Sequence, residues 1–125
     1  MNKEERFKLF KTNLLKIAEA KSPSFVIFES SNDKFVQFAG FREMGLMCDI
    51  PLAGLTKEER RRLLTLKEFS GDEGTKNTGT KELVSYQKNF SGEDIDRAVD
   101  LTERIFIKVL GCPSTYNVEG KLNLQ

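Results

Sequence analysis

Histidine is absent from the 125 residues of this chain, and that absence removes much of ordinary enzyme chemistry. Histidine is the usual general base near neutral pH, the partner of serine and cysteine nucleophiles, and the commonest zinc ligand. The two cysteines, Cys48 and Cys112, do not make a structural zinc site without it, and their spacing is not that of a disulfide framework. The sequence therefore predicts no catalytic residue and no metal site.

Excess charge of either sign is also lacking. Lysine and arginine total 20 against 19 aspartate and glutamate, so a net charge of +1 gives little attraction for nucleic acid or an acidic membrane surface. No apolar run is long enough to span a membrane, and the first 20 residues lack the apolar core of a secretory signal. No Walker loop or dinucleotide fingerprint appears. We expect a cytoplasmic protein with reduced cysteines and no nucleic-acid, membrane or small-molecule cofactor partner.

The stretch from residue 25 to residue 50 predicts a three-stranded antiparallel meander. Two apolar runs rich in β-branched and aromatic residues, 25–28 and 35–38, flank the polar turn cluster Ser30–Asp33. Two such runs so close in sequence indicate a hairpin. A second turn between Gly40 and Gly45 then leads to a third strand that ends at the proline after Ile50.

The loops of the meander set which side chains face the core. A two- or four-residue turn centred on Ser31–Asn32 places Phe28 opposite Phe35, and a three-residue second loop places Phe38 opposite Leu46. Alternation along the strands then predicts a core face made of Phe25, Ile27, Val36, Phe38, Leu46, Cys48 and Ile50. The opposite face is mixed and carries Val26, Phe28, Phe35, Gln37, Met47 and Asp49.

This mixed second face has two interpretations. Later segments of the chain or a dimer partner cover it, or it is an exposed apolar patch that binds another polypeptide. On the second interpretation, the partner-binding residues are Val26, Phe28, Phe35, Gln37 and Met47.

Three helices are expected around the meander. Apolar positions at three- and four-residue steps predict one over residues 3–20, ended by the Ser22-Pro23 pair. The capping box Thr56–Glu59 begins a second. A long apolar stripe over residues 95–110, capped by Ser91 and ended at Gly111, predicts the third.

The segments between the second and third helices are less regular. Residues 64–69 are either the last turns of the second helix or a short strand, residues 70–80 form a mobile loop, and residues 82–90 alternate like a strand near an edge. The predicted fold is α+β in the order α-β-β-β-α-β-β-α, with the meander plus a second hairpin in one antiparallel sheet and three helices on one of its faces. We expect one domain over residues 1–111 and a C-terminal tail over 112–125, in which Leu122 and Leu124 add a short strand or dock loosely.

Two groups of charged residues are candidates for chemistry. Three consecutive arginines at 60–62 point to three faces of a helix, so we interpret them as a solvated helix start partly paired with Glu58 and Glu59, with a partner interface as the alternative. Asp49 together with Glu29 or Glu43 would suit acid and base catalysis, but each is more simply a surface charge.

The order of elements, the strand Phe35-Val36-Gln37-Phe38-Ala39 and the helix start near Leu55 carry a family likeness. Over residues 3–111 the chain resembles the class I type III secretion chaperones and the YbjN-type proteins grouped with them as TY-Chap domains. The resemblance implies a homodimer that holds an extended, unfolded segment of a client protein against apolar grooves, without nucleotide or metal. It also implies client contacts at the outward strand positions Val26, Phe28, Phe35 and Met47.

The sequence thus favours a non-catalytic, chaperone-like module that binds a protein or peptide client and forms a homodimer. An immunity- or antitoxin-type inhibitor that binds a folded toxin is the alternative, and a small carboxylate-dependent enzyme is the less favoured one. The first two differ in whether the partner is an extended segment or a folded protein.

Overall fold

The computed structural model describes residues 1–70, 75–76 and 83–125. Its helices are α1 (Lys3–Ala18), the short 3-10 turn η1 (Leu52–Gly54), α2 (Lys57–Leu63), and α3 (Ile95–Arg104), which continues as the π-helical turn η2 (Ile105–Val109). Its strands are β1 (Ser24–Ser30), β2 (Phe35–Phe41), β3 (Gly45–Pro51), β4 (Thr75–Lys76), β5 (Leu83–Phe90) and β6 (Val118–Asn123).

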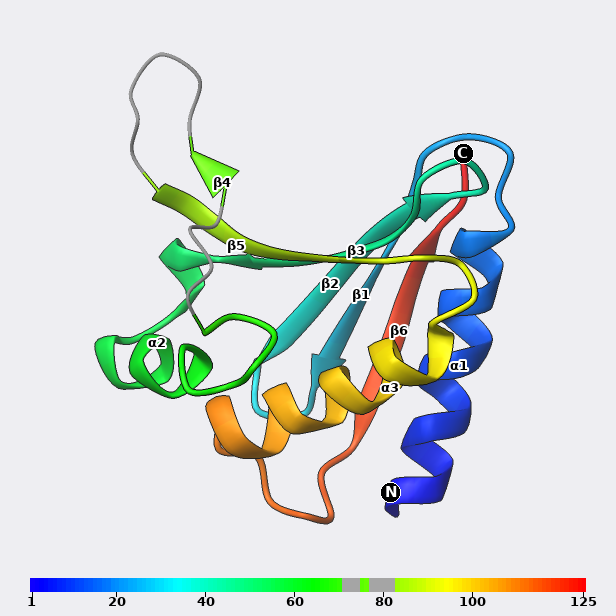
Figure 1. Ribbon diagram of the computed structural model, residues 1–125. Helices are drawn as coiled ribbons and strands as arrows, with labels where there is room; N and C mark the ends of the chain where they lie inside the picture. Colours follow the sequence, from blue (N-terminus) through cyan, green and yellow to red (C-terminus); the bar gives the residue numbers. More distant parts are fainter. Residues whose placement is uncertain (71–74, 77–82) are drawn as a thin grey trace.

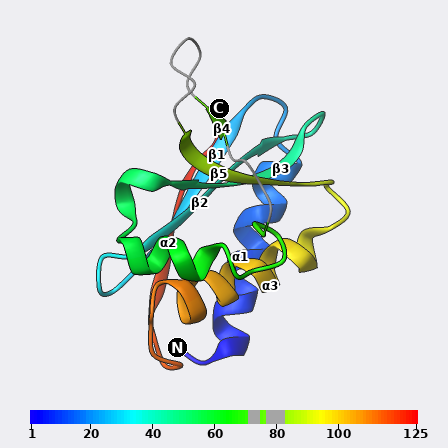
Figure 2. The same ribbon diagram turned by 60° about the vertical axis from the view of Figure 1, so that its left-hand side comes forward.

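The strands form one antiparallel sheet in the order β4-β5-β3-β2-β1-β6. Helices α1, α2 and α3 all lie on the same side of it (Figures 1 and 2). The predicted α+β class and its order of helices and strands are confirmed. No helix within the described ranges has the length and hydropathy needed to cross a membrane.

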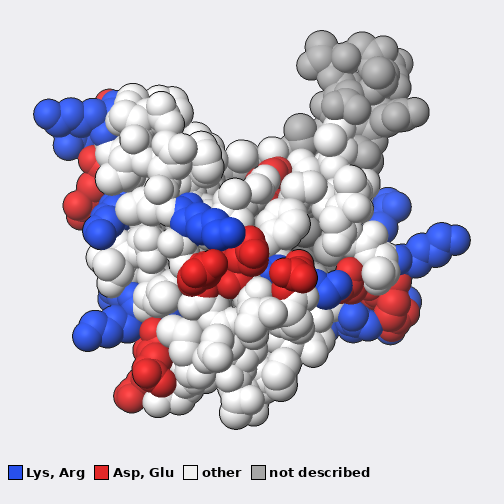
Figure 3. All heavy atoms as spheres, turned by 180° about the vertical axis from the view of Figure 1, so that it is seen from behind, with Lys and Arg blue, Asp and Glu red and all other residues white. Residues whose placement is uncertain are grey.

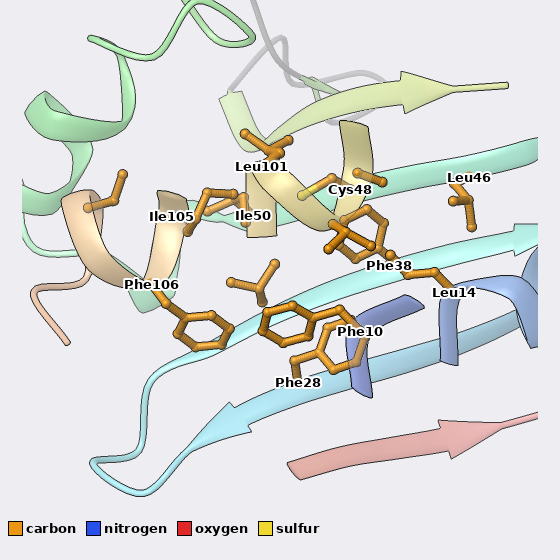
Figure 4. Close-up of a cluster of buried hydrophobic side chains, with 14 of the residues drawn as sticks. Phe10, Leu14, Phe28, Phe38, Leu46, Cys48, Ile50, Leu101, Ile105 and Phe106 are labelled. Carbon is orange, nitrogen blue, oxygen red and sulfur yellow. The ribbon is translucent and has the colours of Figure 1, made fainter. Parts of the chain in front are cut away.

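The core lies between this helix layer and the inner face of the sheet. Phe10 of α1 meets Phe28 of β1 edge to face, with ring centroids 4.9 Å apart, and stacks on Phe106 of η2 at 6.2 Å. Figure 4 shows these rings converging with Leu14 and Phe38. Burial of so many large apolar groups is the main source of stability, at about 1.5–3 kcal/mol for each side chain. The helix layer therefore decides which sheet face is inside.

The predicted register of the first hairpin is wrong by one residue. Phe28 pairs with Val36, not with Phe35. The cause is the loop, which has three residues between Ser30 and Lys34, closed by a hydrogen bond from the Ser30 amide to the Lys34 carbonyl (2.7 Å). Asp33 makes this loop possible by adopting a φ of +62°, which aspartate tolerates better than most residues.

A one-residue shift exchanges the two faces of a strand. In β1, Val26 and Phe28 therefore point into the core and are fully buried, whereas Phe25 and Ile27 lie on the outer face. The predicted placement of Val26 and Phe28 on the outer face, and of Phe25 and Ile27 in the core, is corrected accordingly.

The second hairpin differs from prediction by two residues. Phe38 pairs with Cys48 and Gly40 with Leu46, because the loop occupies residues 42–44 and Gly45 has a φ of +83°. An even shift leaves every side chain on its predicted face, so Leu46 and Cys48 are buried as expected. Burial also raises the pKa of the Cys48 thiol, which suits a core residue and not a reactive one.

Helix α2 ends at Leu63, and turns follow it as far as Ser70. The proposed strand at 64–69 is therefore not formed, and the hairpin partner of β5 is the two-residue strand β4 instead. Most of the loop predicted at 70–80 lies outside the described residues.

The segment predicted to be a C-terminal tail belongs to the sheet. Strand β6 pairs with β1 along its whole length, with Val26 opposite Leu122, so the fold continues past the expected boundary at residue 111. Only Val118 and Leu122 mark β6 as inward-facing, because Gly120 occupies the inward position between them. Of the two alternatives expected for this segment, the short strand is the one that forms, with Leu122 in it and Leu124 beyond its end. The gap in the apolar alternation weakens the signal for this strand in the sequence.

Candidate functional site

The outer face of the sheet lies opposite the helix layer. Phe25 of β1 and Phe35 of β2 are 41% and 37% exposed there, and Ile27 and Met47 are half-buried beside them. Figure 3 views the molecule from behind Figure 1 and shows a hollowed surface with mostly uncharged atoms, next to a group of acidic and basic side chains. Large exposed aromatic groups on one face are unusual enough to suggest an interaction surface.

A shallow depression of about 150 Å³ lies in this face. Three neighbouring strands, β1, β2 and β3, supply its walls, and the register brings their alternate residues side by side. Its lining is apolar apart from one amide and one carboxylate, and comprises Phe25, Ile27, Gln37, Phe38, Ala39, Met47 and Asp49. We call this set the open-face site, leaving out Phe38, whose side chain points into the core, and adding Phe35 and Gln87.

A polar row crosses the open-face site at right angles to the strands. Asp49 of β3 lies between Gln37 of β2 and Gln87 of β5 in the register of the sheet. The Gln37 side-chain amide donates to Asp49 Oδ2 (2.6 Å), and the Gln87 amide donates to Oδ1 (3.0 Å). Both carboxylate oxygens are therefore held in place by neutral donors.

No ion pair to Asp49 is formed within the part of the chain that the structure describes. Its carboxylate is half-buried beside apolar side chains, where a charge interacts more strongly with an approaching cation than it does in bulk water. Asp49 is thus a fixed negative charge in an apolar surround.

Three of the five residues predicted to bind a partner come together in the open-face site. Phe35, Gln37 and Met47 lie on the outer face as expected. Val26 and Phe28 do not, and their places are taken by Phe25 and Ile27. The signal that could have revealed this is Asp33, since a three-residue hairpin loop commonly ends in a residue with positive φ.

The carboxylates considered for catalysis are not gathered into one site. Glu29 pairs with Lys121 (3.0 Å), Glu43 is exposed in the turn between β2 and β3, and Asp49 is held by its two amides. Nor do the described residues contain a cluster of three or more His, Cys, Asp or Glu that could hold a metal ion.

The arginines at 60–62 all make contacts within the chain. The first donates to the Tyr86 hydroxyl (3.2 Å), the second pairs with Glu58, and the third donates twice to the carbonyl oxygen of Val109 (2.9 and 2.6 Å) at the end of η2. A cation at this position also suits the negative end of the helix dipole. All three arginines therefore make contacts within the chain. The predicted pairing with Glu58 is formed, whereas Glu59 pairs with Lys34.

A larger hollow of about 580 Å³ lies between α3, β5 and the turn after α2. Charged side chains of both signs line it, and Arg104 bonds both Glu68 (2.8 and 2.5 Å) and Asp100 (2.7 Å) there. Because these groups already satisfy one another, the open-face site is the stronger candidate.

Comparisons of the chain with protein-family models, with curated proteins and with solved structures found no match. The functional argument therefore rests on the open-face site itself.

Proposed function

We propose that this protein is a non-catalytic protein-binding module that holds an extended segment of another polypeptide on its open-face site. The observation that carries the proposal is a set of exposed and half-buried apolar groups on three adjacent strands, Phe25, Ile27, Phe35 and Met47. They lie on the sheet face opposite the helices of the described residues. We place the module in the cytoplasm, where its two free cysteines stay reduced.

The polar row defines the chemistry of the segment that would fit. Apolar side chains of the segment would rest on Phe25 and Met47 in the depression and on Phe35 beyond it, and a lysine or arginine among them would reach Asp49. A cation there would add a hydrogen bond in which both partners are charged, and such bonds are among the stronger polar interactions in proteins. We therefore expect a partner segment with one basic residue between apolar ones.

The test is selection from a peptide display library with the purified chain as bait. We expect enriched peptides with Lys or Arg flanked by apolar residues at alternate positions. Asp49→Asn should weaken binding of such a peptide by roughly tenfold, the value of one charge-assisted hydrogen bond, and should remove the preference for the basic residue. Enrichment of peptides without a basic residue would contradict the proposed chemistry.

A second variant tests the apolar contacts. Phe25→Ser combined with Phe35→Ser should abolish peptide binding while the melting temperature changes little, because both side chains are more than a third exposed. Leu15→Gln is the matched control, since Leu15 is 36% exposed but lies on α1 in the opposite layer. Equal loss of binding in the control and the double variant would refute the assignment.

The inhibitor alternative makes a different prediction in the same assay. If no peptide is enriched and a folded partner protein binds through the same residues, the protein is an inhibitor of the immunity or antitoxin type and not a holder of extended segments.

A further inference from the structure

Strand β6 is the last strand of the sheet and pairs with β1 on one side only (Figure 1). The residue before it, Asn117, accepts a hydrogen bond from the amide of Ser31 next to β1 (3.1 Å). Backbone groups alternate in direction along a strand, so odd-numbered residues of β6 bond to β1. The even-numbered residues Val118, Gly120 and Leu122 direct their N–H and C=O groups to the outer edge.

The outer edge of β6 is open within the described part of the chain. The Val118 amide donates to the Met1 sulfur (3.4 Å), which confirms that it points away from β1. The backbone groups of Gly120 and Leu122 make no hydrogen bond on this side to any described residue. Such an edge is a template for another strand.

The side chains of β6 on the outer sheet face carry opposite charges two residues apart. Glu119 lies directly opposite Glu29 of β1. Lys121 is the next residue of β6 on this face, and its ammonium group bonds the Glu29 carboxylate (3.0 Å). Like charges placed directly opposite each other on neighbouring strands destabilise a sheet. Glu119 makes no ion pair among the described residues, because the ammonium group of Lys121 bonds Glu29 instead.

We propose that a second copy of this chain adds to the edge, with β6 pairing antiparallel to β6 about a two-fold axis at Gly120. This register places Gly120 opposite Gly120 of the partner subunit, where each would direct both backbone groups at the other. Glu119 then lies opposite Lys121 of the partner subunit, and Lys121 opposite Glu119 of the partner subunit. These are non-hydrogen-bonded pairs, in which the Cα atoms lie only about 4.5 Å apart and the side chains are close. The inference goes beyond the proposed function and does not depend on it.

The charge pattern selects this register over its neighbours. A shift by one step in either direction keeps the backbone groups matched but places Glu119 opposite Glu119 of the partner subunit, or Lys121 opposite Lys121 of the partner subunit. Only the register centred on Gly120 sets unlike charges across the axis. A charged edge strand usually discourages pairing with unrelated strands, whereas this sequence, Val118-Glu-Gly-Lys-Leu-Asn123, is complementary to itself.

A charge-reversal series on the full chain, followed by sedimentation velocity at low ionic strength, tests the proposal. We expect the wild type to form a concentration-dependent dimer. E119K and K121E should each raise the dissociation constant by about tenfold or more, because two attractive pairs become two repulsive ones. The double variant E119K/K121E should restore the dimer, since the two positions remain complementary.

Glu43→Lys is the control for the change in net charge, because Glu43 is exposed in the turn between β2 and β3 and is not on the edge. Thermal unfolding by circular dichroism checks that each variant folds. In the double variant the lysine introduced at position 119 lies opposite Glu29, so Glu29 keeps a basic neighbour on β6. A wild type that stays monomeric at every concentration overturns the proposal. So does a dimer unaffected by the single reversals, or a folded double variant that does not recover it.

Discussion

Replacement of Glu103 by glutamine should strongly destabilise this protein, because it breaks a buried ion pair. The side chain is 9% exposed and meets Arg6, which is 1% exposed, through two parallel hydrogen bonds of 2.9 and 2.7 Å. The Tyr116 hydroxyl donates to the same carboxylate (2.6 Å), and the Arg6 guanidinium lies 4.1 Å from the Tyr116 ring centre. The cluster joins α1, α3 and the segment before β6.

The expected magnitude follows from burial. Glutamine keeps the shape of Glu103 but leaves the Arg6 guanidinium buried without its counter-charge, and breaking a buried pair in this way costs about 3–5 kcal/mol. That is a large part of the 5–15 kcal/mol by which domains are usually stable. We expect the melting temperature to fall by roughly 10–20 °C for a chain of this size.

Urea unfolding followed by circular dichroism measures this, with the midpoint falling and the slope unchanged. Asp96→Asn is the control, since Asp96 pairs with Lys11 at the surface, where both side chains are at least half exposed, and should cost at most about 1 kcal/mol. Arg6→Met together with Glu103→Leu should cost less than Glu103→Gln alone, because no charge remains buried. Equal losses from Glu103→Gln and the surface control would refute the reasoning.

Two further predictions concern acid and the second hairpin. Hydrogen bonds from a basic partner lower the pKa of Glu68, and for Glu59 and Glu103 burial, which raises the pKa, is outweighed by such bonds. The stabilisation by these three carboxylates is therefore complete above the unfolded-state pKa of about 4.3 and is lost as the pH falls below it. Because the chain has no histidine, urea midpoints should be constant between about pH 7 and 5.5 and should decrease at lower pH. A decrease that starts at about pH 6.5 would contradict this. Gly45→Ala should lower the free energy of unfolding by at least about 2 kcal/mol, because Gly45 has a positive φ and a β-carbon there would lie 2.5 Å from a carbonyl oxygen of β5. Gly92→Ala is the control and should change it by less than about 0.5 kcal/mol, since nothing lies within 4 Å of the added carbon. Similar urea midpoints for the two variants would show that the strain at Gly45 is absent.

The helices and the sheet could be predicted because their signals are local. The capping box Thr56–Glu59 forms as read from the sequence, with the Thr56 hydroxyl accepting from the Glu59 amide and the Glu59 carboxylate accepting from the Thr56 amide. The apolar stripe of α3 is likewise buried along its length. Each of these features depends on residues within one or two turns of helix.

The faces of the strands could not be predicted so well, because they depend on the parity of the loops. The first loop was expected to have an even number of residues and has three, so β1 turned its predicted inner residues outward. The predicted register of the second hairpin was wrong by two residues, and an even shift leaves every side chain on its predicted face. The predicted outer-face position of Phe35, Gln37 and Met47 is correct for this reason, since they belong to strands whose faces the second loop preserved.

The polar row of the open-face site was beyond prediction from spacing altogether. Gln37 and Asp49 are on consecutive strands. Gln87 is 38 positions after Asp49 in the sequence, and it reaches Asp49 only because β5 lies next to β3 in the sheet. An aspartate beside apolar neighbours resembles a surface charge in the sequence, and it becomes a fixed anion only when a strand from the other half of the chain supplies the second amide. The partner chemistry that we propose therefore arises from the strand order. Loss of the β3–β5 pairing should release Asp49 to solvent and remove the selectivity for a basic residue even if the apolar groups stay in place.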